Sequence, residues 1–435
     1  EDKDWYSYKD KKWANAETQD GSLWVWIPRF AYRINSSTQT TDVVFLKGTT
    51  DEYCDENGNI QIAKRCRSKE EKVDTEAGYT LHPAFTDESS IGFRNGGWDK
   101  ELAGIWVSKF EAAYATSGEV PNKAPVKESS VVYTTETVVA YLMEVQGVNS
   151  EAMDDASIPA RNWLDGVYEA NKEKIKYPTF QGSSYSMNYI SINDSNNISR
   201  VLTEPGNIYG LSLDTDSHLM KNSEWGACTY LARDSKYGIG NKEIAVNNKN
   251  LNNGGVSTTK EQGNKLASVY AVTGYNANNN EWNDYLGNNL SSSTTGNIYG
   301  IYDMSGGLWE RNASYINNGN QYLEKYGASV VIGKDKSTKY ATVYPYSDVG
   351  ADGNEKAATN YKLNDKIYGD SISETSSEGK GNSSWYGSYS YYPEGVSAFF
   401  SYGGHCCDGS NAGLSAFYSF YGDAYWRHGY RCILV

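Results

Sequence analysis

Gly300-Ile301-Tyr302-Asp303-Met304-Ser305-Gly306-Gly307-Leu308-Trp309-Glu310 is the stretch that decides the expected fold of this 435-residue chain. Three further stretches accompany it, far apart in the sequence: Gly104–Glu111 (GIWVSKFE), His218–Ala227 (HLMKNSEWGA) and Gly429–Ile433 (GYRCI). What these stretches imply depends first on the kind of chain that carries them.

The composition indicates a folded protein with many loops. Hydrophobic residues make up 39% of the chain and charged residues 22%, which excludes an intrinsically disordered polymer. The 37 Tyr, 42 Gly and long Asn- and Ser-rich stretches favour an irregular fold over a helical bundle. A chain of this length forms one large domain or two ordinary ones, and it can bury a core without a metal or disulfide. We therefore expect no cofactor.

The charge balance excludes one class of partner. With 54 acidic and 40 basic residues the net charge is −14, which repels nucleic acid. No run of 18 apolar residues occurs, and the first residues lack a basic-then-apolar signal pattern, so we expect no membrane insertion. A chain that begins with Glu1 is expected to be a processed product or part of a longer polypeptide.

Several local patterns predict secondary structure. The aromatic run Trp24–Ile27, which ends at Pro28, predicts a buried strand. Residues 136–146 predict a helix that Gly147 closes. A second helix should begin at Asn222 or Ser223 and place one stripe of residues in the core, namely Trp225, Cys228, Thr229 and Ala232. Residues 241–298 and 350–384 are polar and predict long surface loops with few packed side chains.

The six cysteines show no CxxC pair and no zinc-ligand spacing. Cys54 and Cys66 flank an Asn57-Gly58 turn that predicts a hairpin, and either a disulfide or two free thiols fits this spacing. The four His lie outside known metal and hydrolase motifs. Residues 327–334 are a poor match to a phosphate-binding loop, and a strand from Ser329 to Ile332 is the better prediction.

The C-terminal segment, residues 381–435, has a distinct composition. It contains nine Tyr, a single Glu and no Lys, Gln or Met. Tyr, Ser, Gly, His and Asp are typical of antibody-like contact surfaces, because Tyr offers a large rigid plate at low entropic cost. The alternative is a series of aromatic core strands, and we expect that role for Phe399, Phe417, Tyr430 and Ile433.

Three of these stretches, Gly300–Glu310, His218–Ala227 and Gly429–Ile433, resemble the formylglycine-generating-enzyme branch of the C-type-lectin-like fold and together cover most of residues 200–435, and Gly104–Glu111 adds support upstream. The resemblance implies a loop-rich α+β fold with few helices and short antiparallel strands. It implies a domain over residues 101–435, with insertions at about 241–298 and 317–384, on which an aromatic-rich segment of residues 1–100 packs. We expect Arg431, in the last strand, to pair with a buried acid, for which Glu310 is one candidate.

Within that branch, Gly403-Gly404, Gly409–Gly413, Gly422 and Ala424 resemble the fixed framework of variable proteins made by diversity-generating retroelements of bacteria and phages. In such proteins adenines are randomised, mostly in Asn codons, which yields residues such as Tyr, Ser, His, Cys, Asp, Phe and Arg. The resemblance implies a variable region at about 398–430. The predicted solvent-facing, ligand-binding residues are His405, Cys406, Cys407, Asp408, Tyr418, Ser419, Phe420, Tyr421, Asp423, Tyr425, Trp426, Arg427 and His428.

Two positions depart from this pattern. Trp426 cannot arise from an Asn codon, and Tyr402 stands where the branch commonly has Arg. The adjacent Cys406 and Cys407 do not reproduce the cysteine spacing of the enzyme members, so the copper-dependent oxidase activity is not carried over. A strained vicinal bridge is also disfavoured, and we expect two exposed thiols there.

The resemblance implies a receptor-type protein that is not an enzyme and needs no metal. Its variable surface would recognise a protein or glycan on host or neighbouring cells, from a phage tail or a bacterial cell surface, with display in several copies. Two alternatives remain: an oxidase of the formylglycine-generating kind, and an undiversified carbohydrate-binding module of a phage tail or surface layer.

Overall fold

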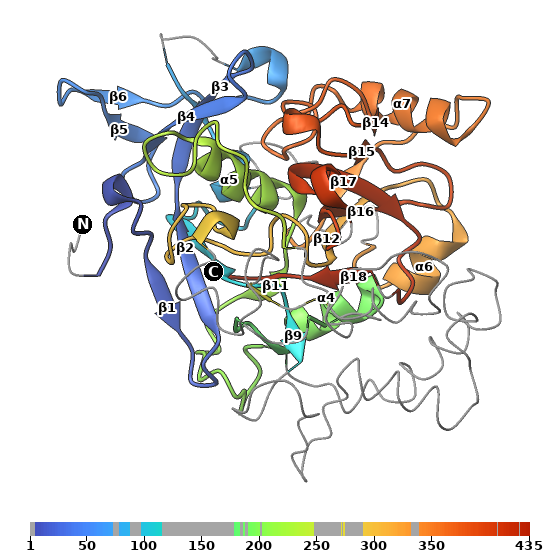
Figure 1. Ribbon diagram of the computed structural model, residues 1–435, viewed down its shortest axis with the longest axis horizontal. Helices are drawn as coiled ribbons and strands as arrows, with labels where there is room; N and C mark the ends of the chain where they lie inside the picture. Colours follow the sequence, from blue (N-terminus) through green and yellow to red (C-terminus); the bar gives the residue numbers. More distant parts are fainter. Residues whose placement is uncertain are drawn as a thin grey trace.

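The computed structural model describes residues 5–72, 78–87, 97–114, 178–182, 186–187, 190–200, 202–247, 271, 273–274, 290–331, 339–406, 408–425 and 427–435. Short strands, long connections and few helices make the architecture α+β, as expected (Figure 1). The α-helices in the described part of the chain are α4 (Ile192–Arg200), α5 (Asn222–Arg233), α6 (Gln321–Gly327) and α7 (Gly353–Leu363).

The first sheet joins the two ends of the chain. Its order is β1 (Asn15–Glu17), β2 (Leu23–Pro28), β8 (Gly104–Ser108), β19 (Cys432–Leu434) and β11 (Ser217–Leu219), all antiparallel. The predicted strand at Trp24 is confirmed as the inner strand β2. Gly104 pairs with Pro28, and a Cβ there would lie 2.5 Å from the Ile27 carbonyl oxygen. Only glycine therefore permits this close pairing.

The second sheet is built on β12 (Trp309–Ile316), which is buried along its whole length. Its order is β13 (Thr342–Tyr344), β12, β16 (Phe399–Gly403), β17 (Gly413–Phe420), β15 (Ser390–Tyr391) and β14 (Lys380–Gly381), and β18 (His428–Tyr430) also pairs with β12. The expectation of antiparallel strands holds only in part. β12 runs parallel to β13 and β18, and β15 runs parallel to β17, so this sheet is mixed.

Smaller sheets complete the described architecture. β4 (Thr40–Phe45), β3 (Phe30–Asn35) and β7 (Thr80–Leu81) form one, and β9 (Ala113–Tyr114) pairs with β10 (Pro178–Thr179). β5 (Glu52–Cys54) and β6 (Ile60–Ile62) form the predicted hairpin. Short 3-10 turns lie at Tyr8–Asp10, Lys69–Glu71, Pro83–Phe85, Leu290–Ser292, Trp385–Gly387 and Gly409–Asn411.

Helix α5 begins at Asn222, as predicted, and is buried on every side. The indole Nε1 of Trp225 donates to the Leu414 carbonyl oxygen at 2.9 Å, which fixes the helix against β17. Cys228 is fully buried, so its expected role in the core is confirmed. Gly226 leaves room for the backbone of Gly369, because a Cβ at residue 226 would lie 2.1 Å from that carbonyl oxygen.

Residues 350–384 are not a surface loop, which corrects the expectation from their polar composition. They contain α7, and the segment after it packs on α5 with Tyr368, Asp370 and Ile372 buried. Polar groups can be buried there because they pair with each other. The Glu374 carboxylate accepts the Tyr230 hydroxyl at 2.8 Å and the Gly369 N–H at 2.6 Å.

Other segments that were predicted as insertions or loops also contain regular secondary structure or buried residues. Residues 317–349 of the expected second insertion supply α6 and the sheet strand β13. A turn follows α6 at residues 328–330, where a strand from Ser329 was expected. Of residues 241–298 the structure describes 241–247, 271, 273–274 and 290–298, and several of them are buried, including Asn247 and Ser293. The helix predicted at 136–146 lies outside the described residues.

Cys54 and Cys66 are free thiols and form no disulfide. The hairpin ends at Ile62, so Cys66 lies beyond it in the core, where its thiol donates to the Glu71 carbonyl oxygen at 3.3 Å. Cys54 is exposed on the hairpin. The turn between them was predicted correctly, because the Gly58 N–H donates to the Asp55 carbonyl oxygen at 3.0 Å.

The predicted pair of Arg431 and Glu310 is confirmed at the centre of the molecule. Guanidinium Nε lies 2.9 Å from Oε2 and Nη2 lies 2.6 Å from Oε1, with both side chains fully buried. Arg431 also donates to the carbonyl oxygens of Ser108, at 2.6 Å, and Tyr302, at 2.8 Å. One side chain thus connects three of the four stretches from which the fold was expected.

Candidate ligand-binding surface

The candidate surface lies on one face of the second sheet, where β12, β16 and β17 run side by side. In their register Arg311 is opposite Ser401, and Ser401 is opposite Tyr418. Residues directly opposite each other in an antiparallel pair point to the same face of the sheet. The side chains on this face are therefore buried at Arg311 and exposed to solvent at Tyr418. Tyr418 is 36% exposed, whereas Arg311 is fully buried.

Tyr418 is the centre of an aromatic cluster. Its ring centroid lies 5.8 Å from those of Tyr389 and Tyr391 and 5.6 Å from that of Trp309. Trp309 is nearly buried and supports Tyr418 from the sheet side. Because rings at these separations attract each other, the cluster holds Tyr418 in a defined orientation.

A second group of rings extends this surface to helix α6. Tyr421 is 37% exposed, and its ring lies 5.8 Å from that of Tyr322. Tyr326 lies one turn further along α6, 5.4 Å from Tyr322. The Asn320 side chain caps the helix by accepting the Tyr322 N–H at 2.8 Å. We call the combined set the tyrosine surface, which comprises Tyr322, Tyr326, Tyr389, Tyr391, Tyr418 and Tyr421.

The electrostatics favour the neutral phenols of Tyr391 and Tyr418. Burial, followed by the neighbouring tyrosines 389, 421 and 425, raises the pKa of Tyr418. Burial and then the charge of Glu394 raise the pKa of Tyr391 to about 12. Each hydroxyl therefore remains able both to donate and to accept a hydrogen bond near neutral pH.

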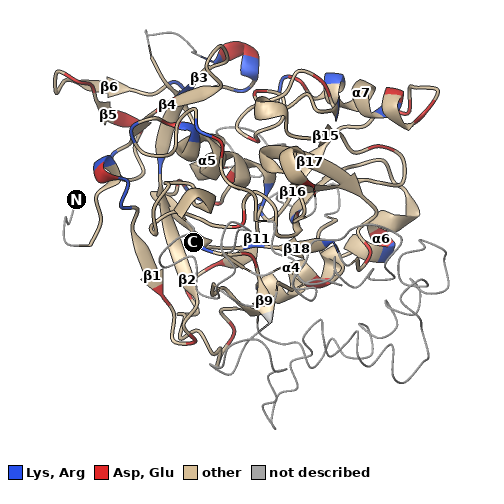
Figure 2. Ribbon diagram, in the orientation of Figure 1, with Lys and Arg blue, Asp and Glu red and all other residues tan. Residues whose placement is uncertain are grey.

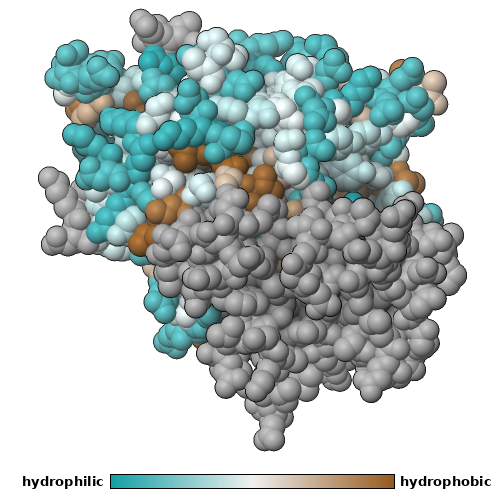
Figure 3. Space-filling model, viewed as in Figure 1, coloured by the Kyte–Doolittle hydropathy of each residue, from teal (hydrophilic) through white to brown (hydrophobic). Residues whose placement is uncertain are grey.

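Few apolar residues show on the part of this surface that Figure 3 displays in colour. In the view of Figure 3 the region over β15, β16 and β17 is mainly pale or hydrophilic. This is the character of tyrosine, which combines an apolar ring with a polar tip. A surface of this kind contacts polar ligands, such as glycans and protein loops, as readily as apolar ones.

A glycine turn aims the loop that follows β16. Gly403 and Gly404 have φ of +89° and +87°, which favours glycine, and a Cβ on Gly404 would lie 2.5 Å from the Ala412 Cβ. The Gly306 N–H donates to the Gly403 carbonyl oxygen at 3.0 Å, and the Cys406 N–H donates to the Gly307 carbonyl oxygen at 2.9 Å. The loop is thus drawn back against the Gly306-Gly307 segment.

This geometry corrects the expectation that every predicted contact residue faces solvent. Tyr418, Tyr421 and Arg427 are exposed, and Asp408 and Tyr425 are half-buried. Cys407 and Trp426 lie outside the described residues. The remaining six predicted contact residues are buried: His405, Cys406, Ser419, Phe420, Asp423 and His428.

The burial has identifiable causes. Phe420 lies between the Arg311 guanidinium, 4.3 Å from its ring centroid, and the His428 ring, at 4.7 Å. The backbone carbonyl of Asp423 accepts a hydrogen bond from Arg311, which draws this turn inward. His405 and Cys406 follow the loop back toward Gly307. Cys406 is therefore not the exposed thiol that was expected.

The expected core residues of the C-terminal segment, Phe399, Phe417, Tyr430 and Ile433, are all fully buried, as predicted. Sequence reasoning missed Tyr322 and Tyr326, because they lie in a region interpreted as an insertion. Their spacing of four residues directly after Asn320 is the available signal, since a capped helix places such a pair on one face.

Two core cysteines of the described part of the chain are held in their thiol form. Burial raises the pKa of the Cys228 thiol and raises that of Cys432 to about 12, so both remain protonated. No group of three or more His, Cys, Asp or Glu among the described residues is arranged to hold a metal ion. Within the described part of the chain, no helix has the length and apolarity needed to span a membrane.

No protein-family model matches this chain, and no curated protein matches it either.

Proposed function

We propose that this protein is a receptor-type binding protein that contacts its ligand through the tyrosine surface. The observation that carries the proposal is the position of Tyr418 and Tyr421, each more than a third exposed, on a strand and turn anchored in the core. Tyr425 and Arg427 extend the surface, because both act electrostatically on Tyr418.

The rigidity of the support favours binding. β17 is the neighbour of β16, which pairs with the fully buried β12, so the rings lose little conformational freedom when a ligand arrives. Rigid aromatic side chains on such a support dominate the energetics of many interfaces. Arg427 adds a charged group that can form bidentate hydrogen bonds with a carboxylate.

We further propose the C-type-lectin-like fold of the formylglycine-generating-enzyme branch. Support comes from the convergence of Ser108, Tyr302 and Glu310 on Arg431, since each belongs to one of the stretches that resemble this branch. The proposed ligand is a protein or glycan on a host or neighbouring cell, and the proposed location is a phage tail or bacterial surface. Display in several copies would offset a weak single-site affinity.

The proposed diversification is concentrated at exposed and half-buried positions. Asp408, Tyr418, Tyr421, Tyr425 and Arg427 can change without altering the core. Buried positions such as Phe420 and His428 tolerate far less, because cores respond to changes in volume of even one methylene group. The burial of six predicted positions favours the second candidate function, an undiversified module that binds a carbohydrate through the same surface.

Nucleotide sequence separates the two candidates. Diversification requires an imperfect copy of the DNA that encodes residues 398–430, differing at adenines, beside a reverse transcriptase gene. We expect the differences to be concentrated in the codons of the exposed residues. Absence of such a copy from the complete genome of the carrier would refute diversification and leave the undiversified module. Loss of the ligand on replacing Tyr418 and Tyr421 is expected under both candidates.

A further inference from the structure

The β5–β6 hairpin carries a feature that the tyrosine surface does not account for. In Figure 1 the hairpin projects at the side of the molecule opposite β16 and β17. It forms a two-stranded sheet of its own, and β6 has β5 as its one partner among the described strands. The outer edge of β6 therefore has no described strand beside it.

The hydrogen-bond ladder shows which groups lie on that edge. The Asp55 N–H donates to the Asn59 carbonyl oxygen at 2.9 Å, and the Ala63 N–H donates to the Asp51 carbonyl oxygen at 2.8 Å. Bonded and non-bonded residue pairs alternate along an antiparallel ladder. The pairs that contain Ile60 and Ile62 are thus the non-bonded ones, so these two residues direct N–H and C=O groups away from β5.

The side chains of β6 are also exposed to solvent. Ile60 is 65% exposed and Ile62 is 66% exposed, and the exposed Cys54 lies opposite Ile60 on the same face. Natural edge strands usually carry a charge, a proline or a bulge that discourages a further strand. β6 reads Ile-Gln-Ile and carries no such residue.

The charges of the hairpin indicate that a basic partner strand would bind at this edge. The hairpin segment from Asp51 to Ile62 contains four acids and no Lys or Arg, and Figure 2 shows red and no blue along it. Arg29 and Arg65 neutralise Asp51. Glu52, Asp55 and Glu56 outnumber the nearby Lys47 and Lys236 and so attract a basic segment, whereas a second copy of the hairpin would add carboxylates to carboxylates.

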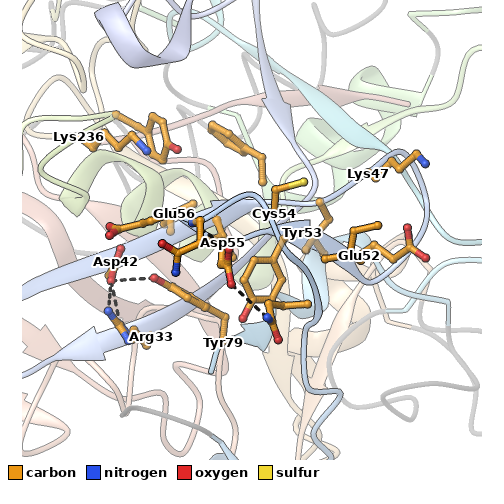
Figure 4. Close-up of a pocket in the computed structure, with 18 residues that line it drawn as sticks. Arg33, Asp42, Lys47, Glu52, Tyr53, Cys54, Asp55, Glu56, Tyr79 and Lys236 are labelled. Atoms are coloured by element: carbon orange, nitrogen blue, oxygen red, sulfur yellow. Dashed lines mark hydrogen bonds and ion pairs between the residues drawn. The ribbon is translucent and has the colours of Figure 1, made fainter. Parts of the chain in front are cut away.

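A pocket lies behind the same hairpin. Its volume is about 1020 Å³, and it is lined by residues of β4 and of the hairpin together with Tyr79, Lys236 and Tyr237 (Figure 4). Ile60 and Gln61 of β6 both line this pocket, together with Cys54 of β5. A strand added to β6 would lie beside the pocket, near Glu56 and the aromatic ring of Tyr53.

We propose that β6 is a docking edge for an extended basic segment of a partner protein. The partner adds a strand to the hairpin by main-chain hydrogen bonds to Ile60 and Ile62, with apolar residues at alternate positions against the two isoleucines. Lys or Arg side chains between them lie at the acidic hairpin and its pocket. This site is separate from the tyrosine surface and does not depend on it.

The test uses the full chain and a fluorescein-labelled peptide of sequence TVKVRVT, with fluorescence anisotropy as the readout. We expect saturable binding that Ile62→Pro weakens at least about tenfold, because proline removes the outward N–H without removing a bond to β5. Ile62→Val is the matched control and should bind as the wild type does. Ile62→Lys retains the N–H but opposes the basic peptide, so it should also weaken binding at least about tenfold. The acidic peptide TVEVEVT should bind at least about tenfold more weakly than TVKVRVT.

Several results would overturn the proposal. One is no binding of TVKVRVT, and another is equal binding by the wild type and by an Ile62→Lys variant with an unchanged circular dichroism spectrum. Equal affinity for the acidic peptide would remove the charge argument. A dimer of the wild type in sedimentation that Ile62→Pro dissociates would assign the edge to a second copy instead. Loss of peptide binding in Tyr418→Ala would show that the two sites are not separate.

Discussion

Trp309 supports Tyr418: their ring centroids lie 5.6 Å apart, and the first ring is nearly buried while the second is 36% exposed. Trp309 begins β12 and is followed by Glu310, the partner of Arg431. The residue that opens the central strand thus also supports the middle of the tyrosine surface. Core and candidate binding surface are in direct contact at this pair.

Replacing single tyrosines by alanine should distinguish those on the surface from those in the core. We expect Tyr421→Ala to change the free energy of unfolding by less than about 0.5 kcal/mol, because its ring is 37% exposed. Tyr392→Ala should cost about 3–5 kcal/mol, since that ring is buried against Phe400 at 5.2 Å. Urea denaturation measures both. A loss for Tyr421→Ala as large as that for Tyr392→Ala would place Tyr421 in the core.

Replacing Arg431 should strongly destabilise the folded protein. Arg431→Ala leaves Glu310 buried without its cation, and we expect a loss of about 3–5 kcal/mol in the free energy of unfolding. The double variant Arg431→Met with Glu310→Leu removes both charges and should be more stable than Arg431→Ala alone. An unchanged denaturation midpoint for Arg431→Ala would contradict the central role of the pair.

Stability should fall as the pH rises above mild acidity. Burial raises the pKa of Asp303 to about 6 and that of Glu310 to about 7, and it raises the pKa of Glu111 well above its usual range. A carboxyl whose pKa is higher in the folded than in the unfolded protein makes its full contribution to stability when the pH is below its unfolded pKa. This contribution is lost as the pH rises through the folded values.

Burial lowers the pKa of His82, which opposes this effect below about pH 6.5, so the free energy of unfolding should decrease between about pH 6.5 and about pH 8. Glu111→Gln should show a smaller decrease, because one buried carboxyl no longer ionises. The amide can still pair with the Ser186 hydroxyl and the Leu308 N–H, which Glu111 binds in the wild type. Glu324→Gln, on the exposed part of α6, is the control and should retain the wild-type slope. Equal slopes for all three proteins would refute the assignment.

The glycine turn gives a paired test. Gly404→Ala introduces a Cβ 2.5 Å from the Ala412 Cβ at a φ of +87°, whereas a Cβ at Gly409 meets nothing within 4 Å at a φ of +57°. We expect Gly409→Ala to cost about 1–2 kcal/mol from backbone strain alone. Gly404→Ala adds a steric clash and should cost at least about 1 kcal/mol more. Equal thermal stability of the two variants would contradict the described turn.

Some parts of the fold could be predicted from the sequence because a strong local pattern, or a buried charge that needs a partner, determines them. The aromatic run at Trp24, the helix start at Asn222 and the hairpin at Asn57-Gly58 were each recognisable from a few neighbouring residues. The partner of Arg431 was also predictable, because a buried guanidinium needs an acid and Glu310 lies in the most distinctive stretch.

Burial in polar segments was not predictable from composition. Residues 368–375 resemble a surface loop, yet Glu374 pairs with tyrosines from β3 and α5, residues that are distant in sequence. Likewise Phe420 and His428 resemble contact residues, but they pack on each other and against Arg311. Such pairings depend on tertiary proximity, so a residue type alone does not distinguish a contact surface from a core.

The most direct test of the central claim measures binding of the full chain to a panel of immobilised glycans and intact bacterial cells. It compares the wild type with Tyr418→Ala/Tyr421→Ala and with Trp5→Ala, whose ring is 50% exposed but is not part of the tyrosine surface. The account predicts that Trp5→Ala binds the same panel members as the wild type, while the folded double variant loses at least about tenfold in affinity. Wild-type affinity of the folded double variant for those members would contradict the account.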